Sequence, residues 1–137
     1  MKAKQILIVE DEPRIALALC RALEFPLRED YRVEISPVAE TALSKLKNEH
    51  FDLLVTDLRM PGMGGMELLR QVRTASPHTR AILITAFGSL EVEEVVKRLG
   101  ARYLPKPFSL REFVALVEEM LEEDATQREA NTAWTAT

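Results

Sequence analysis

The chain has 137 residues, of which 47% are hydrophobic and 29% charged, and this balance excludes both a disordered chain and a membrane-spanning one. Eighteen Lys and Arg residues against 22 Asp and Glu residues give a net charge of −4, so direct nucleic-acid binding is not expected. The single cysteine, Cys20, cannot form an intramolecular disulfide, and the first apolar run, at 6–9, is too short for a signal peptide or a membrane span. We therefore expect one ordinary domain in the cytoplasm, with no membrane contact.

Short apolar runs alternate along the chain with segments of helical pattern. In chain order the predicted elements are a strand at 5–9, a helix at 13–23, a strand at 33–35, a helix at 36–48, a strand at 53–56, a helix at 65–74, a strand at 81–85, a helix at 89–99, a strand at 102–104 and a helix at 109–122. The runs at 5–9, 53–56 and 81–85 lack polar alternation, which is typical of strands buried on both faces.

Local signals mark several of the predicted helix ends. Ser36 followed by Pro37 is typical of an N-cap and a first-turn proline. Ser109 and Glu112 have the spacing of a capping box, and Gly100 is placed to end the helix before it.

A strand followed by a helix, five times over, predicts an α/β fold with a doubly wound five-stranded parallel sheet and helices on both faces. In such sheets, ligands bind beyond the carboxyl ends of the strands. The residues just after each apolar run are therefore the candidate functional residues.

Polar side chains stand at four of these strand ends. Glu10 and Asp11 follow the first run, Asp57 follows the third, Thr85 ends the fourth, and Lys106 lies just past the fifth. Three carboxylates at one edge of a sheet repel one another, and at least one should take up a proton unless a cation lies among them. A hard divalent ion with oxygen ligands, such as Mg²⁺, would relieve that repulsion.

The same set of groups suits phosphoryl transfer, because that chemistry consists mostly of positioning and charge neutralisation. A metal ion would keep Asp57 ionised and therefore nucleophilic. Lys106 could hold an anionic group against Asp57, and Thr85 adds a hydroxyl donor.

Four motifs then resemble the receiver domain of two-component response regulators, over about residues 4–121. They are ILIVEDE at 6–12, LVTDLRMPG at 54–62, ILITA at 82–86 and YLPKPF at 103–108. The acceptor segment and TAFGS at 85–89 are most similar to receivers of the nitrogen-regulatory type. In those proteins, an ATPase domain and a DNA-binding helix-turn-helix follow the receiver.

The resemblance implies a flavodoxin-like (β/α)5 fold with strand order 2-1-3-4-5. It also implies that Asp57 accepts a phosphoryl group from the phosphohistidine of a sensor histidine kinase, with Mg²⁺ as the cofactor. Asp11 and Asp57 would be direct metal ligands, Glu10 would act through water, and the backbone carbonyl of Arg59 would be the third protein ligand.

The remaining roles implied by the resemblance concern the phosphoryl group and the switch. Lys106, Thr85 and the backbone N–H of Ala86 would contact the phosphoryl oxygens. The peptide bond between the lysine and the following proline is cis in most receivers. Tyr103 would turn inward as Thr85 moves. This shift would change the face made by the fourth helix, fifth strand and fifth helix, where we expect a downstream effector or a second copy of the chain to bind.

The chain departs from the family pattern in the acceptor loop. It has Gly64 where the family commonly has aspartate, which removes a loop hydrogen bond but no expected ligand. We assign residues 1–122 to the receiver and leave 123–137 as a tail, an extension of the last helix or the start of a linker.

Three other functions compete with this interpretation. A phosphatase or phosphotransferase of the haloacid dehalogenase type would need a second acid two residues after the nucleophile, where Arg59 stands. A pseudo-receiver would interact without accepting phosphate. A flavin-binding protein would need a phosphate loop where the acidic residues 10–12 lie. We therefore expect a switch rather than a turnover enzyme on an external substrate.

Overall fold

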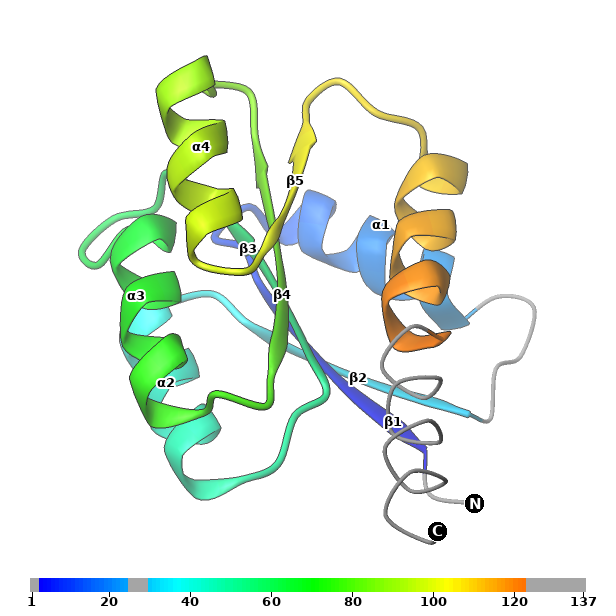
Figure 1. Cartoon of the computed structure of the whole chain (residues 1–137). Coiled ribbons are helices and arrows are strands. Elements are labelled where there is room, and N and C mark those ends of the chain that lie inside the picture. The colour runs from blue at the N-terminus through cyan, green and yellow to red at the C-terminus, as the bar shows by residue number, and fades with distance from the viewer. Residues whose placement is uncertain (1–2, 25–29, 123–137) are drawn as a thin grey trace, which may run out of the picture.

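The computed structural model describes residues 3–24 and 30–122. Five parallel strands form one sheet in the order β2-β1-β3-β4-β5, which confirms the predicted topology (Figure 1). The strands are β1 (Lys4–Val9), β2 (Tyr31–Ser36), β3 (Leu53–Asp57), β4 (Arg80–Thr85) and β5 (Arg102–Pro105). The helices are α1 (Pro13–Glu24), α2 (Ala39–Asn48), α3 (Gly65–Ala75), α4 (Leu90–Arg98) and the last helix, described over residues 110–122. The expected tail at 123–137 lies outside the described residues.

Alternate residues of the central strands face opposite layers, as the two-residue period of a strand requires. Leu7, Leu54 and Leu83 pack with α2, α3 and α4, whereas Ile8 and Val55 pack with α1 and the last helix. Figure 1 shows these two groups of helices on either side of the sheet. Both faces of β1, β3 and β4 are therefore covered, which explains their continuous apolar sequences.

The two outer strands differ from the central ones because each pairs on one side only. Strands β2 and β5 lie at the edges of the sheet and are only partly buried, whereas every residue of β3 is buried. Their weaker apolar runs reflect this exposure. No helix in the described part of the chain is long and apolar enough to cross a membrane.

The predicted cap at Ser36 is wrong. Ser36 is the last residue of β2, where it pairs with Val9, and its hydroxyl donates to the carbonyl of Val38 at 3.0 Å. Helix α2 begins only at Ala39. The parallel ladder extends through Ser36, whose carbonyl accepts the N–H of Glu10, so this residue cannot also start a helix.

Other predicted helix ends are confirmed. The hydroxyl of Ser89 accepts the N–H of Val92, and the hydroxyl of Ser109 accepts the N–H of Glu112 at 3.0 Å. Caps of this kind stabilise a helix by about 1 kcal/mol. Gly100 follows α4 with φ +74°, a conformation that side chains other than glycine rarely adopt.

Candidate functional site

The register of the sheet brings the polar strand ends to one edge. Val9 of β1 pairs with Thr56 of β3, so the next residues, Glu10 and Asp57, lie side by side. Thr85 follows Ile84, the partner of Asp57 in β4. Thr85 pairs with Pro105, the last residue of β5, so Lys106 comes next. The backbone N–H of Lys106 donates to the carbonyl of Thr85 at 2.9 Å. Glu10, Asp57, Thr85 and Lys106 thus converge, as predicted.

Asp57 is buried, with 7% of its surface exposed, and both of its carboxylate oxygens are engaged. The ammonium of Lys106 lies 2.6 Å from Oδ2, and the backbone N–H of Arg59 donates to Oδ1 at 3.1 Å. The peptide bond between Lys106 and Pro107 is cis, as expected. A charge-assisted bond of this length fixes the orientation of the Asp57 side chain.

Glu10 has an electrostatic conflict in the same place. It is buried, one oxygen accepts the N–H of Glu12 at 3.2 Å, and the other oxygen has no hydrogen-bond partner among the described residues. Burial, followed by the neighbouring Asp57 carboxylate, raises the pKa of Glu10 to about 7, although Glu12 and Lys106 oppose the shift. Two neighbouring carboxylates at this buried site repel each other, and a bound cation would relieve that repulsion.

Asp11 differs from the two buried acids. Its side chain is exposed, and no three Asp, Glu, His or Cys side chains within the described ranges form a group ready to hold a metal ion. The structure therefore brings two of the three predicted carboxylates together.

Thr85 is buried, and its hydroxyl accepts the backbone N–H of Phe87 at 2.9 Å. The hydroxyl hydrogen remains available for donation, because this bond uses only an oxygen lone pair. Ala86, whose N–H was expected to contact a phosphoryl group, is exposed. The loop that begins at Thr85 thus carries both predicted donors.

Tyr103 is half-buried on β5 and packs against the core on the α4 side of the sheet. A Cβ placed on Gly88 would lie only 1.4 Å from the Tyr103 hydroxyl oxygen. The tyrosine therefore rests on the backbone of the β4–α4 loop, in space that only glycine leaves open. The sequence indicated Tyr103 but gave no sign of Gly88, because the two meet only in the folded chain.

Two further residues that the sequence did not single out contact the segment between β3 and α3. A Cβ on Gly65 would lie 2.0 Å from the carbonyl oxygen of Asp57, so Gly65 allows α3 to start directly against the end of β3. Glu40, on α2, accepts the N–H of Met63 at 2.7 Å. In the sequence, Glu40 resembles an ordinary acid in the first turn of a helix.

Arg59 and Phe87 form the outer rim of the site. The guanidinium carbon of Arg59 lies 4.2 Å from the centre of the Phe87 ring, a cation–π contact between exposed side chains. The side chain of Arg59 therefore packs on Phe87 and connects the β3–α3 loop to the β4–α4 loop. It supplies no second acid for a phosphatase mechanism.

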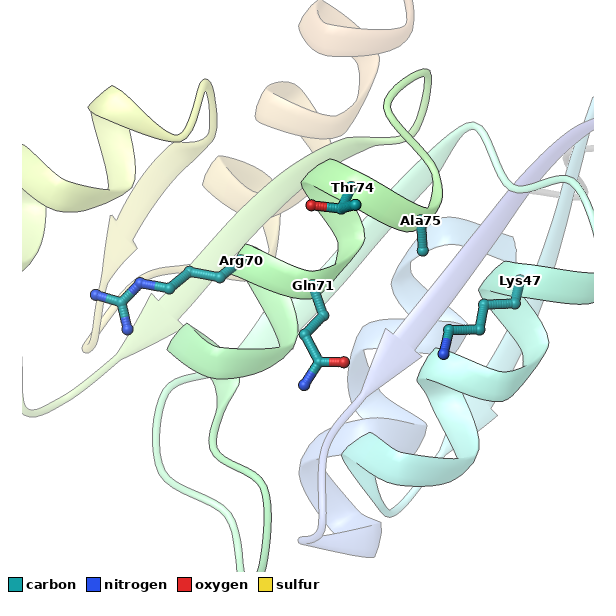
Figure 2. Close-up of a pocket in the computed structure, with 5 residues that line it drawn as sticks. All are labelled: Lys47, Arg70, Gln71, Thr74 and Ala75. Atoms are coloured by element: carbon teal, nitrogen blue, oxygen red, sulfur yellow. The ribbon is translucent and has the colours of Figure 1, made fainter.

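A separate hollow of about 590 Å³ lies between α2 and α3 (Figure 2). Its lining residues are Lys47, Arg70, Gln71, Thr74 and Ala75. Lys47 comes from α2 and the other four residues from α3, and none of them stands at the carboxyl end of a strand. This hollow is not part of the candidate site.

Comparisons with known proteins agree with the geometry. The family model for the response regulator receiver domain matches residues 6–118. The response regulator protein FleR of Pseudomonas aeruginosa is 38% identical over 116 residues, which cover 84% of this chain and 24% of FleR. The chain thus spans about a quarter of that relative.

Solved structures give the same result. The CheY-like receiver domain protein from Methanospirillum hungatei JF-1 superposes with a TM-score of 0.85 at 35% identity, covering 92% of this chain and 99% of the other. The beryllofluoride-activated NtrC4 receiver domain dimer gives a TM-score of 0.79 at 30% identity, covering 88% and 98%. The nitrogen-regulatory type is therefore among the related types.

The family match covers most of the chain and includes all four strand ends that converge at the site. Receivers of this family act as phosphorylation-dependent switches in two-component signalling. This chain belongs to the response regulator receiver domain family.

Proposed function

We propose that Asp57 accepts the phosphoryl group in this receiver, from the phosphohistidine of a sensor histidine kinase. The observation that carries the proposal is the arrangement around its carboxylate. Asp57 is buried at a strand end, is paired with Lys106 at 2.6 Å, and lies beside Glu10, one of whose buried oxygens has no partner among residues 3–24 and 30–122. A merely structural aspartate would not need a second acid left unsatisfied beside it.

In the transfer, a carboxylate oxygen of Asp57 forms a bond to phosphorus as the bond from phosphorus to the histidine nitrogen breaks. Lys106 is paired with Asp57 beforehand and can follow the new negative charge onto the phosphoryl oxygens. Thr85 donates its free hydroxyl hydrogen, and Ala86 its N–H, to the same oxygens. These residues position the group and neutralise its charge, which is most of what the reaction requires.

The residues present suit a magnesium ion. Glu10, Asp11, Asp57 and the backbone carbonyl of Arg59 provide only oxygen donors, which Mg²⁺ prefers. The orphaned oxygen of Glu10 and the raised pKa of this group are the features that a divalent cation would correct. When bound, the ion would neutralise negative charge as the phosphoryl group approaches the carboxylates.

Phosphorylation would then bias the loop that begins at Thr85. The hydroxyl of Thr85 now accepts from Phe87, and a phosphoryl group at Asp57 would give it a second partner. Movement of this loop changes the support under Tyr103, whose hydroxyl rests on Gly88. We propose Thr85 and Tyr103 as the switch pair that carries the change to α4 and β5.

The partners follow from this role. We propose a sensor histidine kinase as the phosphoryl donor and a downstream effector domain or protein as the recipient of the signal, without turnover of an external substrate. The free buried thiol of Cys20 suits the reducing cytoplasm, where we place this reaction.

We also propose a homodimer through the face made by α4, β5 and the last helix. Leu90, in the first turn of α4, is 80% exposed, and Leu110, at the start of the last helix, is 47% exposed. A related receiver forms a dimer when activated by beryllofluoride. Sedimentation should show a dimer in the presence of beryllofluoride and Mg²⁺, and Leu90→Glu should abolish it. If the unsubstituted chain is a monomer both with and without beryllofluoride, the dimer proposal is contradicted.

The first experiment is intact-protein mass spectrometry after incubation with acetyl phosphate. We expect one phosphoryl adduct that requires both Mg²⁺ and Asp57, so EDTA or Asp57→Asn removes it. An adduct that survives Asp57→Asn would contradict the assignment. If neither acetyl phosphate nor beryllofluoride binds with Mg²⁺, the pseudo-receiver interpretation is the better one.

A further inference from the structure

The loop between Asp57 and α3 packs Leu58, Met60 and Met63 against the core, but glycines flank Met63. These are Gly62 and Gly64, and Gly64 caps α3 without a side-chain hydrogen bond. The proposed metal ligand of the loop, the carbonyl of Arg59, belongs to the peptide that links Arg59 to Met60. Glycines cost conformational entropy to hold in one conformation, so the loop needs an anchor from another element.

Glu40 provides such a contact from α2. Its Oε1 accepts the backbone N–H of Met63 at 2.7 Å, and the same oxygen lies 2.8 Å from where a Cβ of Gly62 would stand. Gly62 has φ +77°, a conformation that favours glycine. The carboxylate of Glu40 therefore contacts the loop at Met63, directly beside the position where a side chain on residue 62 would lie.

The base of this contact is rigid. Ala39, which precedes Glu40, is fully buried, and α2 packs against α3 and β1 through the core. The hydrogen bond spans 23 residues of sequence and has a charged acceptor, although it is exposed to solvent, which reduces its strength. The bond draws the pKa of Glu40 below its ordinary value, so the carboxylate is ionised at neutral pH.

We propose that Glu40 is a positioning residue for the metal site: through the backbone N–H of Met63 it holds the loop that presents the Arg59 carbonyl next to Asp57. It touches neither the metal nor the phosphoryl group. This inference rests on the proposed function, since it concerns how the same site is assembled. It also gives α2, otherwise remote from the chemistry, a direct connection to the acceptor loop.

Titration calorimetry of the full chain with MgCl2 tests the proposal. We expect Glu40→Ala to weaken Mg²⁺ binding by about tenfold, at the low end of the effects seen for outer-shell partners of metal sites. Glu40→Gln keeps an acceptor for Met63 without the charge, so its affinity should lie between those of Glu40→Ala and the unsubstituted chain. The matched control is Glu91→Ala, which removes an exposed acid from the first turn of α4 and should leave binding unchanged.

Two further readouts separate positioning from general damage. The amide resonance of Met63 should move in Glu40→Ala and keep its position in Glu91→Ala, and circular dichroism should show the same folded content in all variants. If Glu40→Ala binds Mg²⁺ as tightly as the unsubstituted chain, the role of Glu40 is overturned and the proposed metal site is not. The same holds if Glu40→Ala and Glu40→Gln lose Mg²⁺ affinity to the same extent. Absence of Mg²⁺ binding by the unsubstituted chain would overturn the proposed metal site, and the inference with it.

Discussion

Strand β3 has a buried aspartate at each end, and the two are engaged in different ways. Asp52 directly precedes the strand and is 5% exposed, whereas Asp57 ends it and is 7% exposed. Each accepts one backbone N–H and meets one cationic or polar side chain. For Asp52 these are the N–H of Gln5 at 2.8 Å and the ring of His50 at 2.9 Å.

The difference lies in what surrounds the two pairs. Burial alone would raise the pKa of Asp52, but the N–H of Gln5 and the ring of His50 outweigh it, and the pKa lies below its ordinary value. Asp57 instead shares its surroundings with Glu10, whose pKa is raised to about 7. A buried, well-paired acid is thus a structural feature, whereas a paired acid crowded by an unsatisfied one indicates a functional site.

The largest contrast should appear in phosphorylation. Asp52→Asn should keep the full phosphoryl adduct with acetyl phosphate and Mg²⁺, whereas Asp57→Asn should have none, because only the carboxyl end of β3 meets Lys106 and Glu10. Intact-protein mass spectrometry measures both. Loss of the adduct in a folded Asp52→Asn variant would remove the distinction between the two ends.

The stability contributed by Glu10, beside the carboxyl end of β3, and by Asp52, at its amino end, should change with pH in opposite directions. The pKa of Glu10 rises from 4.5 to about 7 on folding, so its stabilising contribution is complete below pH 4.5 and is lost as the pH rises through 7. The difference corresponds to about 3 kcal/mol in the free energy of unfolding. At Asp52 the lowered pKa gives stability that is present above its unfolded value and lost only as the pH falls below it.

Urea unfolding at pH 5 and pH 8 in EDTA measures the Glu10 contribution. Glu10→Gln should flatten the pH dependence, and saturating Mg²⁺ should do the same for the unsubstituted chain. If Glu10→Gln retains the full pH dependence, the conflict between the acids is not its source.

A smaller effect is expected from removing the acid at the amino end. Asp52→Ala leaves the N–H of Gln5 without its acceptor and should lower the free energy of unfolding by about 2 kcal/mol. Urea unfolding at pH 7 measures this loss. The exposed Asp30→Ala is the control and should change stability by no more than about 0.5 kcal/mol; equal effects of the two would contradict a structural role for Asp52.

The smallest effect should come from His50, whose side chain is 62% exposed. Ion pairs at the surface contribute about 0.5 kcal/mol or less, so His50→Ala should barely change unfolding at pH 7. A double-mutant cycle with Asp52→Ala isolates the pair. A coupling energy as large as the Asp52→Ala effect itself would show that the histidine, and not the backbone of β1, holds the acid.

Much of the fold and of the candidate site followed from the sequence. The apolar runs at 53–56 and 81–85 predicted central strands, and the strand-end rule then led to Asp57, Glu10 and Lys106 before any contact was known. Their convergence is confirmed, while their ligand and phosphoryl roles remain predictions. The rule works because residues at parallel strand ends become neighbours whatever their separation along the chain.

The features that the sequence did not predict are of two kinds: a residue that suits two alternative local structures, and hydrogen bonds to residues far away in the chain. Ser36 fits both a strand end and a helix cap, and only the ladder beside Val9 decides between them. The roles of Glu40 and Asp52 depend on the N–H groups of Met63 and Gln5, which are 23 and 47 residues away. Backbone N–H groups are the same at every position, so no pattern of side chains announces such bonds.

The contact between Gly88 and Tyr103 has a consequence for how this receiver can change through evolution. Since a Cβ on residue 88 would overlap the tyrosine hydroxyl, any side chain there requires a smaller or differently turned residue at 103. We expect the two positions to vary together among relatives, even though 15 residues separate them in the numbering. A lineage that lost the glycine alone would displace the aromatic ring from the loop that supports it.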